Sequence, residues 1–106
     1  MTYFYIKQND TSPSLLYALT PLTVNLTGAA VVFNMRNESG TVVISREAAT
    51  IVTATGTPTV RYDWQAGDTD TAGAYRFEFE VTYADDSVET FPNYSFGDVT
   101  ISEDIA

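Results

Sequence analysis

The sequence predicts an all-β protein, a single β-sandwich of about seven to nine antiparallel strands that fills residues 1–106 as one domain. Two observations predict it. Short runs rich in β-branched and aromatic residues recur along the chain, separated about every 8–12 residues by turn-forming residues. Several of these runs alternate strictly between apolar and polar residues, which is the period of a strand with one buried face. The segment 45–50 has some helical character, but it is too short to hold a helix on its own.

The expected strands follow one another with short connections. Asn37–Gly40 has the composition of a hairpin turn, Pro21 separates two strand regions, and a bend is expected between residues 48 and 49. The strand regions are residues 2–7, 15–20, 22–28, 29–36, 41–48, 49–53, 59–64, 75–82, 88–91 and 98–103.

The stretch "DTDTAGAYRFEFEV" shows the alternation most clearly. Tyr75, Phe77 and Phe79 fall on one face of the expected strand, and Arg76 and Glu78 fall on the other. We therefore expect a core between two sheets, built from Val31, Phe33, Trp64, Tyr75, Phe77 and Phe79.

The start of the same stretch indicates a tyrosine corner. An Asp and small residues precede a Tyr at the beginning of a long central strand, as in immunoglobulin-like sandwiches. We expect the Tyr75 hydroxyl to bond back to the backbone near Asp70. Phe77 stands where a cysteine often follows such a tyrosine, so the core is packed with aromatic rings in place of a disulfide.

The composition of the chain excludes or disfavours several kinds of chemistry and several kinds of binding partner. Cysteine and histidine are absent, which removes thiolate chemistry, disulfides and the commonest general base. The formal net charge of −9 disfavours nucleic acid and anionic membranes as partners. No signal peptide or membrane span is visible, and we expect synthesis in the cytoplasm of the producing cell.

Two acidic groups raise the question of chemistry. The first group is Asp68–Thr71, joined by Asp98 or by Asp85 and Asp86. One interpretation is a site that binds Ca²⁺ or performs acid/base chemistry. The other is a loop whose side chains cap backbone N–H groups. The second interpretation is favoured because the spacing matches no calcium loop. Glu78 and Glu80 suggest either glycosidase carboxylates or a solvated strand face paired with Arg61 or Arg76, and again the second is favoured. We expect no enzyme, no catalytic or metal-binding residue and no cofactor.

Aromatic residues near the two ends of the chain are the candidate interface. They are Tyr3, Phe4, Tyr5, Tyr94 and Phe96. "MTYFYIKQ" is either the first strand of the sandwich or a docking element that pairs with a neighbour, and both hold if that strand lies at an edge.

Most of residues 5–105 resembles the N-terminal domain of phage baseplate upper proteins. The resemblance is carried by "YIKQNDTSPSLLYALT", "VNLTGAAVVFNMRN", "GTVVISREAATIV", "VRYDWQAGDTDTAGAYRFEFEVTYADDSVETFPN" and "VTISEDI". It implies an immunoglobulin-like sandwich that serves as a virion building block, and it supplies no catalytic residue.

Longer members of that family carry further domains, whereas this sequence ends directly after the sandwich. The resemblance therefore implies a small accessory or connecting subunit of the tail, baseplate or neck, located in the virion. Its expected partners are other virion proteins, and it is expected to be oligomeric in the particle. The alternative is a capsid-decorating or host-glycan-binding module on the particle surface.

Overall fold

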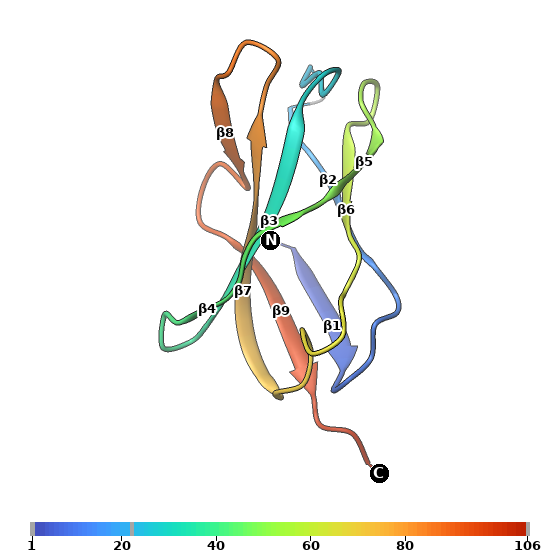
Figure 1. The fold of residues 1–106 in the computed structure, drawn as a ribbon, viewed down its shortest axis with the longest axis vertical. Helices are drawn as coiled ribbons and strands as arrows, with labels where there is room; N and C mark the ends of the chain where they lie inside the picture. Colours follow the sequence, from blue (N-terminus) through green and yellow to red (C-terminus); the bar gives the residue numbers. More distant parts are fainter. Residues whose placement is uncertain (1, 22, 106) are drawn as a thin grey trace.

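The computed structural model describes residues 2–21 and 23–105, and these form nine strands in two sheets and no helix (Figure 1). The strands are β1 (Tyr3–Lys7), β2 (Leu15–Ala18), β3 (Ala30–Asn37), β4 (Val42–Ala48), β5 (Thr50–Thr53), β6 (Thr59–Tyr62), β7 (Gly73–Thr82), β8 (Val88–Phe91) and β9 (Gly97–Ser102). The all-β prediction is confirmed, and residues 45–48 belong to a strand as expected.

The larger sheet has the order β1-β9-β7-β3-β4, with β8 pairing with β7. β8 pairs with the second half of β7 and β9 with its first half, so the ten residues of β7 run through the centre of the sheet. The smaller sheet has the order β2-β6-β5.

The chain passes from one sheet to the other at Ala49, between β4 and β5 (Figure 1). The Ala49 N–H still donates to the Val31 carbonyl oxygen, 2.9 Å away, in the larger sheet. The bend expected between residues 48 and 49 is thus a change of sheet.

One hydrophobic core lies between the two sheets. All six residues expected in it are buried, with no more than 7% of any of them exposed: Val31, Phe33, Trp64, Tyr75, Phe77 and Phe79. The rings of Phe33 and Tyr62 stack across the core at 4.2 Å between centroids. This contact joins β3 of the larger sheet to β6 of the smaller one, so aromatic packing holds the two sheets together.

Two expectations about the strands are wrong. β1 pairs with β9 in parallel, so the larger sheet is mixed and not wholly antiparallel. Residues 23–26 form no strand; Val24 and Leu26 are nevertheless buried, and the Leu26 N–H donates to the Ala54 carbonyl oxygen, 2.9 Å away. Leu22, which the same expected strand includes, lies outside the described residues.

The Tyr75 hydroxyl donates to a backbone carbonyl in the loop before β7, 2.6 Å away. The acceptor is Thr71, one residue after Asp70. The bond ties the loop between the two sheets to the start of the central strand, as expected for a tyrosine corner.

Candidate functional site

The outer face of the larger sheet is the face turned away from β2, β6 and β5. On β7 the buried residues alternate with half-buried ones, so Arg76, Glu78 and Glu80 lie on this outer face. On β1 the alternation places Tyr3, Tyr5 and Lys7 there, because Ile6 is buried in the core. The candidate site is built on this face.

One row of side chains crosses the whole outer face. The strand registers place these residues opposite one another in sequence from β1 to β4: Tyr3, Asp98, Arg76, Arg36 and Val42. Neighbouring positions in such a row are close enough for their side chains to interact.

The predicted interface residues on β1 divide between the two faces. Tyr3 and Tyr5 are 58% and 67% exposed, as expected of contact residues. Phe4 points the other way and stacks on Trp64 at 5.7 Å between ring centroids. The period of two turns Phe4 toward the core, where it is half-buried, and its role as an interface residue stays a prediction. Met1, the start of the proposed docking segment, lies outside the described residues.

The remaining predicted interface residues lie in the loop between β8 and β9. Tyr94 is 90% exposed. Phe96 is half-buried because the guanidinium of Arg76 lies over its ring, with the carbon of the group 4.2 Å from the ring centroid. This cation–π contact attaches the loop to the outer face.

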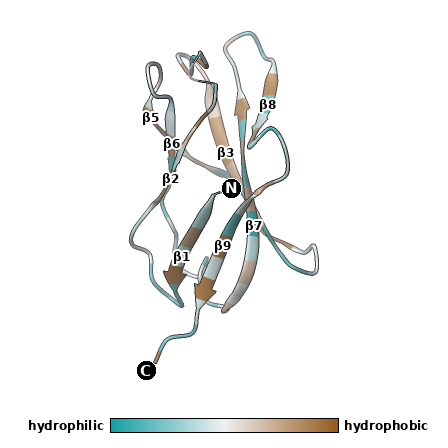
Figure 2. Cartoon of the chain, turned by 180° about the vertical axis from the view of Figure 1, so that it is seen from behind, coloured by the Kyte–Doolittle hydropathy of each residue, from teal (hydrophilic) through white to brown (hydrophobic). Residues whose placement is uncertain are grey.

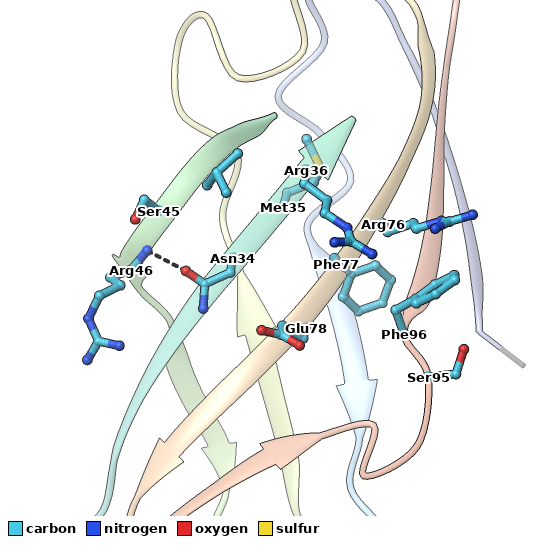
Figure 3. A pocket seen from close by; sticks show the side chains of 11 residues that line it. Asn34, Met35, Arg36, Ser45, Arg46, Arg76, Phe77, Glu78, Ser95 and Phe96 are labelled. Atoms are coloured by element: carbon cyan, nitrogen blue, oxygen red, sulfur yellow. Dashed lines mark hydrogen bonds between the residues drawn. The ribbon is translucent and has the colours of Figure 1, made fainter. Parts of the chain in front are cut away.

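A groove of about 500 Å³ opens between β3, β4, β7 and this loop (Figure 3). Its polar lining consists of Asn34, Arg36, Ser45, Arg46, Arg76 and Glu78, with Ser95 and Phe96 at one side. Three of the five basic residues of the chain thus line one groove, in a protein with a net charge of −9.

Arg36 and Arg76 are cross-strand partners on antiparallel strands. Like charges in this position destabilise a sheet. Among the described residues neither arginine forms an ion pair, because the two ion pairs found there are Arg46 with Glu80 and Arg61 with Asp63. The groove therefore contains two arginines that form no ion pair, with Asp98 opposite Arg76 on the side away from Arg36.

Arg46 sits at a bulge where β4 lies against β3, with a φ of 51°. Its backbone N–H donates to the side-chain oxygen of Asn34, 2.7 Å away (Figure 3). Ser95, on the other side of the groove, has a φ of 64°. Residues in this left-handed region carry a conformational cost and often mark functional sites.

The outer-face carboxylates pair differently from the expectation. Glu80 binds Arg46 at 2.7 Å, while Arg61 binds Asp63 at 2.9 Å on the other sheet. The expected pairing of these glutamates across the sheet with Arg61 or Arg76 is wrong. β6, which carries Arg61, belongs to the smaller sheet, and Arg76 lies on the same strand as both glutamates.

The acidic loop at residues 68–71 is used in capping. The Asp68 carboxylate accepts from the Tyr62 hydroxyl at 2.6 Å and from the Gln65 N–H at 2.8 Å. The Thr69 hydroxyl donates to the Asp10 carbonyl oxygen at 2.7 Å. Within residues 2–21 and 23–105, no three acidic side chains come together in a way that could hold a metal ion.

The pKa is shifted in two side chains near this loop, Tyr62 and Asp63. Burial, followed by the bond to the Asp68 carboxylate, raises the pKa of the Tyr62 phenol well above its ordinary value. On the exposed side of β6, the hydroxyl of Ser14, followed by Arg61, lowers the pKa of Asp63.

Sequence reasoning missed the arginines. The alternation places Arg36 and Arg76 on polar strand faces, but it does not say that the two strands are neighbours or that the two residues are in register. The signal in the sequence was that the chain has only five basic residues, so each of them was a candidate for a specific role. In the structure three of the five line one groove.

Comparison with family models, with curated proteins and with solved structures found no match. No helix capable of crossing a membrane occurs in the part of the chain that the structure describes.

Proposed function

We propose that this chain is an immunoglobulin-like β-sandwich that serves as a structural subunit of a bacteriophage virion. In this role it is a small accessory or connecting subunit of the tail, baseplate or neck. It binds other virion proteins through the outer face of its larger sheet, and it carries out no reaction.

The immunoglobulin-like assignment is supported by three features. Two sheets enclose one core, a buried Trp64 lies two residues after the end of β6, and the Tyr75 hydroxyl bonds to the Thr71 backbone. The virion assignment is supported by the resemblance of the sequence to baseplate upper proteins.

The observation that carries the proposal is the composition of the outer face. Tyr and Arg are among the residues most enriched at protein–protein contacts. Here they form a row across a sheet, with exposed Tyr3 at one end and Arg76 and Arg36 towards the other. Aromatic residues 58–67% exposed on a strand are costly in water and useful in a contact.

β1 supplies a second means of contact. It ends the strand order of the larger sheet, so its outer edge faces no other strand among the described residues. Such an edge pairs readily with an extended segment of a neighbour. The strand itself belongs to the core through Phe4 and Ile6, so removing residues 1–6 would open the sandwich as well as the contact.

The proposal is tested in particles produced with variants of this chain. Tyr3→Ser/Tyr5→Ser changes two exposed side chains on the outer face and should reduce incorporation into purified particles. The matched control is Leu16→Ser/Val52→Ser, which changes two residues 59% and 48% exposed on the smaller sheet. We expect the control to incorporate at the wild-type level. Absence of the wild-type chain from purified particles would overturn the proposal.

A second candidate function is binding of host glycans from the particle surface. It is favoured by Tyr94, 90% exposed in the loop that borders the groove, because an exposed ring can stack on a sugar. Glycan-array binding by the purified chain that is lost in Tyr94→Ser would favour it. No array binding together with stoichiometric presence in particles would favour the structural role.

A further inference from the structure

We propose that the groove between Arg36 and Arg76 receives the acidic segment Glu103–Ile105 of a second copy of this chain, which forms a head-to-tail contact. The inference rests on the proposed function, since it names one partner of the assembly subunit. It assigns the groove a ligand class: an extended peptide that carries carboxylates.

The charges that line the groove favour a negatively charged ligand. Arg36 and Arg76 oppose each other directly across β3 and β7, and neither forms an ion pair among the described residues, although Asp98 lies opposite Arg76 on β9. Arg46, which is paired with Glu80, also lines the groove, and Glu78 is the only acidic lining residue within the described chain. A carboxylate placed between two guanidinium groups would relieve their repulsion and accept charge-assisted hydrogen bonds from both.

The segment after β9 has the complementary chemistry. Glu103 and Asp104 are exposed, and Ile105 is 97% exposed. The backbone ladder of β1 and β9 ends at Ser102, whose carbonyl oxygen accepts the last bond, from the Gln8 N–H. The segment leaves the body at that end, beyond both sheets (Figure 2).

Ile105 provides a hydrophobic anchor beside the two carboxylates. An isoleucine exposed to this degree gains by burial against apolar surface. The groove offers such surface at Phe96 and at Val42, which is 57% exposed. The groove therefore matches both the charges and the apolar residue of the segment.

The segment cannot reach the groove of its own chain. Ser95 and Phe96 border the groove just before β9, and the acidic segment begins after Ser102 at the other end of β9. Phe96 and Glu103 are seven residues apart, which is roughly 23 Å along a strand. Three residues span at most about 11 Å, and they point away from the sheet. The contact must therefore join two copies.

Such a contact is heterologous, because it uses the groove of one copy and the acidic segment Glu103–Ile105 of the next. Variants of this segment are called tail variants below. Heterologous contacts build rings or open chains of subunits. The net charge of −9 repels copies at long range, but salt at about 0.15 M screens charges beyond about 8 Å and leaves short-range pairs effective. We therefore expect weak, concentration-dependent association at this ionic strength.

The proposal is tested by sedimentation velocity of the purified chain at protein concentrations up to about 1 mM. Complexes with a Kd as weak as about 1 mM are populated in this range. Wild type should associate. A groove variant, Arg36→Glu/Arg76→Glu, and a tail variant, Glu103→Lys/Asp104→Lys, should each associate at least tenfold more weakly while remaining folded by circular dichroism. The control Asp10→Lys/Glu47→Lys makes the same charge change as the tail variant at exposed positions elsewhere, and it should associate at least as well as wild type.

Mixing the two variants gives the decisive result. The intact acidic segment of the groove variant fits the intact groove of the tail variant, and the charge-reversed groove and segment also attract each other. The mixture should therefore associate at least tenfold more strongly than either variant alone. A wild-type chain that stays monomeric, or variants that associate like wild type, would overturn the contact. A monomer that still incorporates fully into particles would overturn this contact and leave the proposed function standing. A chain that associates with itself but is absent from purified particles would overturn the proposed function and leave this contact standing.

Discussion

The ring of Phe77 lies directly over Gly97, its cross-strand partner on β9. A methyl group on Gly97 would overlap the ring at three of its carbon atoms. Gly97 is buried at the start of β9, and it is the one glycine of the chain whose role is to admit a neighbouring ring and not to adopt a positive φ. The pair fixes the packing of β9 on β7, and hence the position of the loop that carries Phe96.

Gly97→Ala should destabilise the chain by about 1–3 kcal/mol, the usual cost of overpacking a core. The reason is the clash with the Phe77 ring. Urea unfolding of wild type and variant measures the difference. In a Phe77→Leu background the same change should cost much less, because the ring is gone. Equal costs in the two backgrounds would show that the clash is not the cause.

Phe77→Ala should cost about 3–5 kcal/mol, because it removes a ring that is 1% exposed in the core. This is a large share of the stability of a small domain. Thermal unfolding followed by circular dichroism measures it. An unchanged melting temperature would contradict the inward orientation of the ring.

Tyr75→Phe should cost about 0.5–1.5 kcal/mol, because it removes one hydrogen bond and keeps the packing of the ring. Thr71, the acceptor, lies in an exposed loop, so water can replace part of the lost bond. Tyr5→Phe removes a hydroxyl from a residue 67% exposed and is the matched control. Equal free energies of unfolding for the two variants would remove the tyrosine corner from the account of stability.

Arg36→Gln should destabilise the isolated chain less than Arg61→Gln, or stabilise it slightly. Both changes remove one positive charge, but Arg61 is paired with Asp63 at 2.9 Å, whereas Arg36 opposes Arg76. We expect the two variants to differ by about 0.5–1 kcal/mol. Urea unfolding at low salt measures the difference. A larger loss for Arg36→Gln would show that the pair of arginines is compensated in the free chain.

Stability should fall as the pH rises above the ordinary tyrosine pKa of about 10. Burial, followed by the bond to the Glu89 carboxylate, raises the pKa of Tyr83 to about 12. The folded state therefore holds a proton that the unfolded state releases, and the contribution of this group is present below pH 10 and lost on the way to pH 12. The difference in free energy of unfolding between wild type and Tyr83→Phe should shrink between about pH 9 and pH 12. A constant difference would contradict the shift.

Local pattern was enough to predict most of the strands and the expected core residues. Burial of Phe33, Phe77 and Phe79 follows from an alternation of period two, because a strand turns successive side chains to opposite faces whatever its neighbours are. The bond of Tyr75 to the backbone four residues earlier is also local, and an Asp and small residues before a Tyr were sufficient to predict it. The same rule, applied to β1, would have placed Phe4 inside.

The site itself depends on pairings between distant parts of the chain. Arg36 meets Arg76 only because β3 and β7 are neighbours in one particular register, and a slip of one residue would turn either side chain to the other face. The parallel pairing of β1 with β9 brings Tyr3 to Asp98 from opposite ends of the sequence. Strand order and register are settled by the packing of the whole core, which is why composition and periodicity predicted the sheets but could not assemble the groove.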